Sequence, residues 1–283
     1  MLKQIDLSSA DYPVLLRQLH KPPEQLFYQG TMPDACAPMI AIVGSRRCTD
    51  YGKMVTEQIT KALSKAGLVI VSGLAFGIDA IAHQAALDVG GITIAVLGSG
   101  ADRITPVDHT KLGLSIIANG GAILSQFLPG ARANSFTFPI RNEVIAGMCL
   151  GTLVVEATDH SGSLITAKAA TDNNREVFAV PGPINYPTSR GTNDLLKDGA
   201  HVTTSANDIL DALGFKGHAL KKDSGAETKE ENILLPLLGK QARHIDEIIR
   251  QSKLPSSVVL TSLTMMEISG KVRHLGGNQY IIS

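Results

Sequence analysis

The chain of 283 residues carries 26 Lys and Arg residues against 26 Asp and Glu residues, so it has no global positive field and any nucleic-acid site must be a local patch. Its three cysteines, Cys36, Cys48 and Cys149, are odd in number and widely spaced, which fits neither a disulfide framework nor a metal cluster. The N-terminus lacks a secretion signal and no segment is long enough to cross a bilayer, so we expect a cytoplasmic protein without a membrane partner.

Changes in composition divide the chain into four parts. Residues 1–38, rich in Leu, Pro and polar residues, are expected to pack as an N-terminal segment on a domain that spans residues 39–213. Residues 214–228 contain Lys, Gly, Asp and Ser with few apolar residues, which is typical of a linker. Residues 229–283 then form a smaller second domain.

Short apolar runs alternate with helical patterns in residues 39–213, which predicts a doubly wound, mostly parallel α/β sheet of the Rossmann-like kind. A glycine follows nearly every predicted strand, and glycines let backbone N–H groups converge on an anion. One such loop often serves only its turn, but five on one sheet edge favour a ligand site. The predicted strands are Met39–Val43, Leu68–Val71, Thr93–Leu97, Ala122–Ser125, Leu150–Ala157 and Glu176–Val180.

The spacing of these glycines does not match the common nucleotide-binding loops. Gly73 and Gly77 are too far apart for the dinucleotide fingerprint, and Gly98-Ser99-Gly100 lacks its third glycine. No Gly-Lys-Ser/Thr phosphate loop is present. We therefore expect no nicotinamide cofactor and no nucleoside triphosphatase site.

Residues 229–283 are expected to form a winged-helix module, because three short helices precede a hairpin that turns at Gly276-Gly277. The third helix, Pro255–Ser269, would be the DNA-reading helix, yet it contains no Lys or Arg. Only Lys271 and Arg273 are available to phosphates there. We therefore favour a protein-docking or non-specific role over sequence reading for this module.

Motifs spread over residues 40–210 resemble the DprA/Smf DNA-processing family. The matching segments are Val43–Arg46, Tyr51-Gly52, Ser72–Asp79, Ala82-His83, Ala95–Asp102, Phe138–Asn142, Val154–Ala157, Ser161–Ala167 and Val177–Gly182. The resemblance implies a homodimer that binds single-stranded DNA without sequence preference, protects incoming DNA and loads the RecA recombinase during natural transformation. Single-strand-binding protein is a further implied partner, and no catalytic residue, metal or cofactor is expected.

Several positions depart from the usual family pattern. Glu143 stands where members often have Arg, which removes a positive charge near the expected DNA path. Gln126, Asn174 and Thr105 also replace more frequent residues. The helical N-terminal domain of longer members has no counterpart in this sequence.

Single-stranded DNA of any sequence needs a cationic groove for its phosphates and flat apolar faces for its bases. Arg46 and Arg47 follow the first predicted strand, beside the anion nest of Gly44-Ser45, although both could equally be solvated loop charges. Lys168 lies five residues after Ser163 and is expected to face the same nest from its helix. Phe76 and Phe138 are the candidates for stacking on bases. The alternative is that both rings pack in the apolar core.

Arg141 and Asn142 are expected to open a helix and hold a phosphate there. The alternative for Arg141 is a salt bridge with Glu156 or Asp79. These two acids are expected to orient arginines and cap helices. The predicted DNA-binding residues are Gly44, Ser45, Arg46, Arg47, Gly73, Phe76, Gly77, Phe138, Arg141, Asn142, Ser161, Gly162, Ser163, Thr166 and Lys168, with Asp79, Glu156, Arg175 and Asn193 as supporting residues.

Two other functions remain open from the sequence. Gly151–Glu156 faintly resembles the loop with which Rossmann-like nucleotide phosphoribohydrolases cleave an N-glycosidic bond, although the preceding glycines are missing. A protein scaffold acting through the winged helix is the third possibility.

Overall fold

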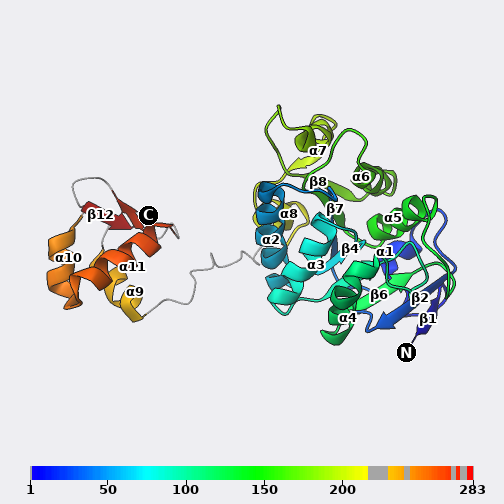
Figure 1. Cartoon of the computed structure of the whole chain (residues 1–283), viewed down its shortest axis with the longest axis horizontal. Coiled ribbons are helices and arrows are strands. Elements are labelled where there is room, and N and C mark those ends of the chain that lie inside the picture. Colours follow the sequence, from blue (N-terminus) through cyan, green and yellow to red (C-terminus); the bar gives the residue numbers. More distant parts are fainter. Residues whose placement is uncertain (1, 216–228, 239–242, 269–271, 275–278, 283) are drawn as a thin grey trace. The chain divides into compact units, whose positions relative to one another are not determined.

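A computed structural model describes residues 2–215, 229–238, 243–268, 272–274 and 279–282 (Figure 1). The chain divides into two compact units, Met1–Ala219 and Leu220–Ser283, which are described separately below. No helix in the described part of the chain has the length and apolar character needed to cross a membrane.

The larger unit is built on a nine-stranded sheet with the strand order β1-β2-β6-β5-β4-β3-β7-β8-β9. Strands β3 to β9 pair in parallel wherever they are neighbours, and their central members are buried throughout, as expected for a sheet covered on both faces. This confirms the predicted doubly wound α/β class. The strands are β1 (Lys3–Asp6), β2 (Gln25–Gly30), β3 (Met39–Val43), β4 (Val69–Ser72), β5 (Thr93–Val96), β6 (Ala122–Ser125), β7 (Gly151–Val154), β8 (Glu176–Ala179) and β9 (His201–Val202).

The N-terminal segment, expected only to pack on the sheet domain, supplies two of these strands. β1 pairs antiparallel with β2, and β2 pairs antiparallel with β6. The short helix α1 (Val14–Arg17) lies between them in the chain. Residues 1–38 therefore extend the sheet by an antiparallel edge.

Helices cover both faces of the sheet (Figure 1). Helices α2, α3 and α4 follow β3, β4 and β5, while α5 and α6 pack against each other. Crossovers between parallel strands are right-handed. The strands that follow β3 are added on one side of it, and those that follow β7 are added on the other side. Helices α2 to α4 therefore lie on one face of the sheet, and helices α5 and α6 lie on the opposite face. The helices are α2 (Asp50–Lys65), α3 (Ile78–Asp88), α4 (Thr110–Ala118), α5 (Thr137–Gly147), α6 (Gly162–Asp172), α7 (Pro187–Lys197) and α8 (Ala206–Ala212).

This topology creates a switch point between the neighbouring strands β3 and β7. From β3 the chain continues to β4 on one side, and from β7 it continues to β8 on the other. Ligands of open α/β sheets bind beyond the carboxyl ends of the strands at such a point. The loops after Val43 and Val154 are therefore placed to form a site.

The smaller unit has the predicted three helices and a β-hairpin around its own apolar core, and it is a winged helix. A short strand, β10, joins the hairpin to make a three-stranded sheet, β10-β12-β11. The predicted turn at Gly276-Gly277, Lys271, and residues 216–228 of the predicted linker lie outside the described residues. Its elements are α9 (Lys229–Leu234), β10 (Arg243–His244), α10 (Ile245–Ser252), α11 (Ser256–Ile268), β11 (Val272–His274) and β12 (Gln279–Ile282).

Candidate functional site

A hollow of about 790 Å³ lies at the switch point, beyond the carboxyl ends of β3 and β7. We call it the trough. Many of the predicted site residues line it, although they are far apart in the sequence. The predicted residues in its lining are Gly44, Ser45, Arg46, Arg47, Asp79, Phe138, Arg141, Asn142, Ser161, Gly162, Ser163 and Thr166.

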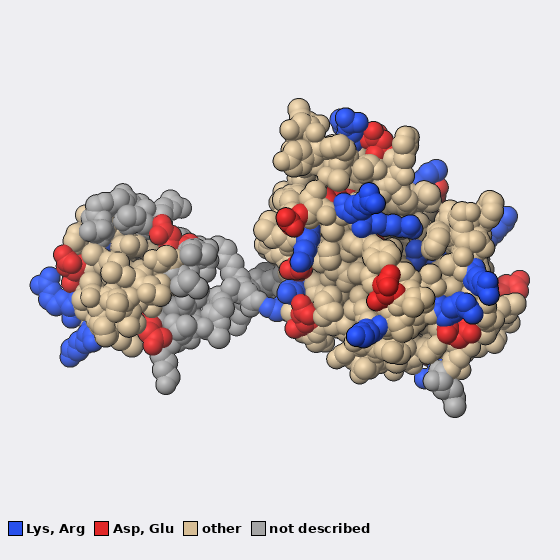
Figure 2. Space-filling model, in the orientation of Figure 1, with Lys and Arg blue, Asp and Glu red and all other residues tan. Residues whose placement is uncertain are grey.

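The exposed cations of the trough come from the loop after β3. Arg46 and Arg47 are both exposed, and the N–H group of Arg47 donates to the hydroxyl of Ser45. On the face shown in Figure 2, Lys and Arg side chains gather on the larger unit near the region that Figure 1 labels β7, β8 and α6. The local positive patch required by the balanced composition is thus present beside the trough.

A helix N-terminus forms the opposite wall. Ser161 caps α6, because its hydroxyl accepts a hydrogen bond from the N–H group of Ser163 and lies 2.7 Å from the hydroxyl of Ser163. Gly162 is exposed at this first turn. The free N–H groups and the dipole of a helix N-terminus favour an anion, so this wall suits a phosphate.

Glu156 holds the arginine loop in place. Its carboxylate accepts hydrogen bonds from the N–H group of Thr49 (2.9 Å) and from the hydroxyl of Thr49 (2.5 Å). Thr49 in turn caps α2. The side chain of Glu156 is buried, and each of its two oxygens accepts one hydrogen bond from Thr49, so it anchors the loop between β3 and α2.

Gly77 fixes the same loop from the other side. It precedes α3 with φ +75°, and a Cβ there would fall against the carbonyl oxygen of Ser45 and the backbone of Arg46. We expect Gly77→Ala to displace that loop and to lower the free energy of unfolding by about 3 kcal/mol, measured by urea denaturation.

Gly90→Ala is the matched control for this prediction. Gly90 also has a positive φ, +71°, but a Cβ there would meet nothing within 4 Å. Its cost should stay near about 1 kcal/mol, the strain of the left-handed backbone alone. Equal losses in the two variants would contradict the contact between Gly77 and the arginine loop.

Arg141 does not open a helix, because α5 begins at Thr137. Its guanidinium is buried, and Nη1 donates to the carbonyl oxygens of Gly73 (2.7 Å) and Val96 (2.5 Å) at the ends of β4 and β5. Nε donates to the side-chain oxygen of Asn142. Arg141 therefore ties two strand ends to α5 while it lines the trough.

A buried carboxylate accompanies this guanidinium. Asp79 accepts hydrogen bonds from the N–H groups of Gly73 (3.1 Å) and Ala75 (3.4 Å). Burial raises the pKa of Asp79, and the positive charge of Arg141 opposes that shift. Burial likewise lowers the pKa of Arg141 to about 10. Each charge therefore stabilises the charged form of the other group. No direct ion pair joins Asp79 and Arg141 among the described residues.

The two stacking candidates differ in what covers their rings. The guanidinium carbons of Arg46 and Arg141 lie 5.5 and 5.8 Å from the ring centre of Phe138, within cation–π range. Phe76 is 45% exposed, and its ring packs at 4.6 Å against the ring of His109. Phe138 thus positions the arginines, while Phe76 has a free face.

Glu143 and seven of the predicted residues lie outside the lining of the trough. Gly73, Phe76, Gly77 and Glu156 lie beside it in the contacts described above, whereas the other three are engaged elsewhere. Lys168 pairs with Asp172 at 2.9 Å in the exposed part of α6. Arg175 donates to the carbonyl oxygen of Leu15 in the N-terminal segment. The third, Asn193, supports a different loop, as described next. In contrast, Ser135, Thr158 and Thr188 line the trough but carry no motif that singles them out in the sequence.

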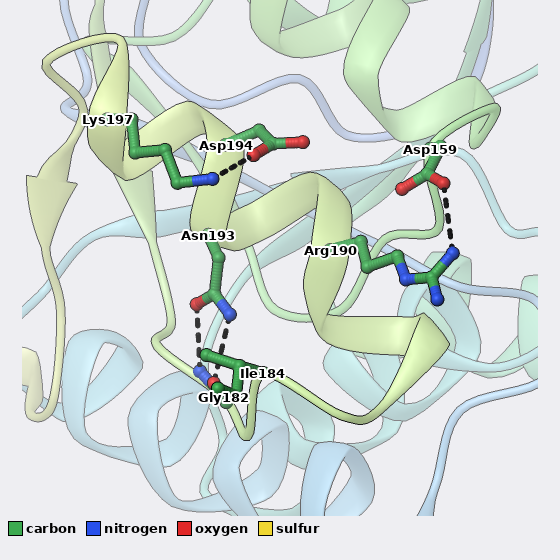
Figure 3. A pocket seen from close by; sticks show the side chains of 7 residues that line it. All are labelled: Asp159, Gly182, Ile184, Arg190, Asn193, Asp194 and Lys197. Carbon is green, nitrogen blue, oxygen red and sulfur yellow. Dashed lines mark hydrogen bonds and ion pairs between the residues drawn. The ribbon is translucent and has the colours of Figure 1, made fainter.

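A second hollow of about 600 Å³ lies along α7 (Figure 3). Asn193 makes two hydrogen bonds to the backbone of Gly182 there, so it supports the loop after β8. Both cations of this hollow have acidic partners. These pairs are Arg190 with Asp159 (3.5 Å) and Lys197 with Asp194 (2.6 Å). Its charges are balanced, which makes it a weaker phosphate site than the trough.

Comparisons with known proteins identify relatives of both units. Residues 3–214 match the family model of DNA recombination-mediator protein A, and residues 218–278 match that of the DprA winged helix domain. Protein Smf of Escherichia coli (strain K12) is 36% identical over 282 residues, which cover 96% of this chain and 75% of that protein. The DNA processing protein DprA of Streptococcus pneumoniae is 43% identical over 204 residues, 72% of each chain.

Solved structures agree with these matches. The crystal structure of DprA from Streptococcus pneumoniae has a TM-score of 0.70 and 40% identity, and the similarity covers 74% of both chains. The structure of DNA processing protein A from Helicobacter pylori, described for its single-stranded DNA binding mode, has a TM-score of 0.67 and 30% identity. It covers 75% of this chain and 95% of that one.

Proposed function

Because the chain belongs to the family of DNA recombination-mediator protein A, we propose that it binds single-stranded DNA, without a defined recognition sequence, in the trough. The observation that carries the proposal is the pairing of exposed Arg46 and Arg47 with the N-terminus of α6 across an open hollow. The binding of single-stranded DNA by the Helicobacter pylori relative supports it.

Each wall of the trough has a separate role in this proposal. Arg46 and Arg47 neutralise phosphates, which gives affinity for any sequence. The hydroxyls of Ser161 and Ser163 and the first N–H groups of α6 hold a further phosphate. Beside the trough, Phe76 offers its exposed ring to a base.

The proposed role is binding rather than catalysis. The acids nearest the arginines, Asp79 and Glu156, are buried and hydrogen-bonded to backbone groups, which suits positioning. The segment that resembles a phosphoribohydrolase loop forms β7 and leads to the engaged Glu156. Release of free base from adenosine monophosphate by the protein would favour that enzyme instead.

Three finer roles are proposed from family membership alone. They are homodimerisation, protection of incoming DNA during natural transformation, and loading of RecA onto DNA in the presence of single-strand-binding protein. Strand exchange by RecA, measured with that protein present and with or without this chain, tests the loading role. An unchanged rate would remove that role and leave the DNA-binding proposal intact.

Arg46→Ala tests the binding site directly. We expect it to weaken binding of a single-stranded oligonucleotide about tenfold for every sequence, because a phosphate contact is lost. The slope of log affinity against log salt should become shallower by about 0.7 for each lost contact. Fluorescence anisotropy at two or more salt concentrations measures both quantities.

Arg190→Ala is the matched control, since Arg190 is an exposed arginine paired with Asp159 in the second hollow. It should leave the affinity and the salt slope unchanged. A duplex of the same length should bind more weakly than the single strand. If Arg46→Ala behaved like Arg190→Ala, Arg46 would not belong to the DNA site.

A further inference from the structure

One short segment, residues 156–161, connects the two walls of the trough. At its start, Glu156 holds the arginine loop through Thr49. At its end, Ser161 caps α6, whose N-terminus we call the phosphate wall. Between them, the carbonyl oxygen of Thr158 accepts a hydrogen bond from the N–H group of Ser161 (3.0 Å), and Thr158 lines the trough. The position of this segment therefore determines where the phosphate wall lies.

The N-terminal half of helix α7 holds the middle of this segment. The N–H group of Ala157 donates to the carbonyl oxygen of Thr188 (2.8 Å), and the N–H group of Gly191 donates to the carbonyl oxygen of Ala157 (2.9 Å). Ala157 is fully buried, whereas the next residue, Thr158, is exposed. The two hydrogen bonds thus fix the last buried residue of the segment before the chain reaches the trough.

Gly191 allows the helix to approach the segment this closely. A Cβ at Gly191 would lie 2.9 Å from the Cβ of Ala157, 2.9 Å from the carbonyl oxygen of Thr158 and 3.0 Å from the carbonyl oxygen of Ala157. Two of these three atoms belong to the main chain, which cannot rotate away as the end of a side chain can. A side chain at this position must therefore push the helix and the segment apart.

The helix is less free to move than the segment. Asn193 follows Gly191 by two residues, about 200° around the helix axis, so it lies on the other side of α7. There it makes two hydrogen bonds to the backbone of Gly182 (Figure 3), and a Cβ at Gly182 would fall against Ser189. Residues 158–160, in contrast, are exposed. A displacement is therefore taken up by the segment, which carries the N-terminus of α6 with it.

We propose that α7 positions the phosphate wall of the trough, and that Gly191 is the positioning residue through which it acts. Gly191 lies outside the lining of the trough and contacts no DNA itself. Its close contact with the segment sets the distance between the first N–H groups of α6 and Arg46, so that one strand reaches both walls. The inference rests on the proposed function and adds to it a residue outside the trough that determines its affinity.

Gly191→Ala tests this role in the full chain. We expect it to weaken binding of 5′-labelled dT12 about tenfold, because a phosphate loses hydrogen bonds to α6 and hydrogen bonds to charged groups are strong. The slope of log affinity against log salt should stay the same, since N–H and hydroxyl donors carry no full charge. Fluorescence anisotropy at several salt concentrations measures both quantities. A stoichiometric titration counts the active fraction, which is all that a purely structural role would change.

A compensating substitution assigns the loss to the contact itself. Ala157→Gly removes one of the three atoms that the new methyl group meets. The double variant Gly191→Ala with Ala157→Gly should therefore bind dT12 within about threefold of the unaltered protein. Asn193→Ala tests the same role without adding bulk, because it releases α7 from Gly182. It should weaken binding about threefold and keep the salt slope.

Two variants serve as matched controls. Gly113→Ala adds the same methyl group to a glycine within helix α4, where its nearest atoms belong to the side chain of Ile104. Arg190→Ala removes the exposed ion pair between α7 and Asp159 but leaves the main-chain contacts of Gly191 in place. Both should bind dT12 with unchanged affinity, since neither displaces the segment.

The outcomes distinguish the two proposals. Unchanged affinity of Gly191→Ala or of Asn193→Ala for dT12, or a double variant that binds no better than Gly191→Ala, would overturn the positioning role while DNA binding stands. A shallower salt slope in Gly191→Ala would locate the change at the arginine loop instead of the phosphate wall, and would overturn it as well. Failure of the unaltered protein to bind dT12 would overturn the proposed function itself.

Discussion

Arg141→Met is expected to lower the free energy of unfolding of the larger unit by about 3–5 kcal/mol. The substitution removes the cation nearest the buried carboxylate of Asp79 and leaves that charge uncompensated. It also removes two donors from the carbonyl oxygens of Gly73 and Val96, which close the ends of β4 and β5. Urea denaturation followed by far-ultraviolet circular dichroism measures the loss.

Two controls assign this loss to the buried charge. The double variant Asp79→Asn with Arg141→Met should recover part of the stability, because the carboxylate is then neutral. Arg190→Met removes an exposed arginine from its pair with Asp159 and should cost less than about 1 kcal/mol. If Arg141→Met also cost less than that, the guanidinium would not stabilise Asp79, and the carboxyl group would be protonated in the folded protein.

Arg141 also shows what the sequence can predict and where it fails. Its motif, Phe138–Asn142, predicts a site residue, and the side chain of Arg141 lines the trough in the structure. The pattern did not indicate that the side chain is buried. Charged residues are rarely buried without a partner, and the partners here are main-chain carbonyl groups of distant strands. Such partners leave no signal in the sequence.

The glycines after the strands were informative for a related reason. Parallel strands bring their carboxyl ends to one edge, so loops that are far apart in the chain converge there. Residue spacing within a helix was a less reliable guide to which side chains line the trough. Lys168 was expected to face the trough from α6, but its side chain pairs with Asp172 one turn later. The N-terminal strands were missed because β2 joins the sheet by pairing with β6, a strand far along the chain.

A pocket of about 110 Å³ between the ends of β4 and β5 could not be predicted from the sequence at all. Its walls come from the loops after β4 and β5 and from α5, and its size depends on how closely they approach. Gly98 and Gly73 indicate close approach only once Phe138 and Arg141 are known to lie against them.

The second large expected effect is a loss of stability in acid that depends on His83. His83 is fully buried, and its Nδ1 lies 2.7 Å from the hydroxyl of Thr93. That hydroxyl donates to the carbonyl oxygen of Ile70, so Nδ1 must carry the hydrogen and donate to Thr93. Nε2 is then unprotonated and has no hydrogen-bond partner among the described residues. Burial lowers the pKa of His83 to about 3, and the charges of His109 and Arg141 act in the same direction.

The unfolded chain takes up this proton near its ordinary pKa of about 6.5, whereas the folded protein resists it down to about 3. Stability is therefore intact above pH 6.5 and falls steadily as the pH drops towards 3. Between pH 7 and pH 4.5 the loss from His83 alone should reach about 2–3 kcal/mol. Urea denaturation at the two pH values measures it.

His83→Leu separates this contribution from other acid effects, because leucine fills the buried site without titrating. Asp79 works in the opposite sense, since its raised pKa makes protonation favour the folded state. That contribution is present in both proteins and cancels in the comparison. The variant should therefore lose about 2–3 kcal/mol less than the unaltered protein between pH 7 and pH 4.5. Equal losses would mean that His83 is protonated in the folded state and that a polar group reaches Nε2.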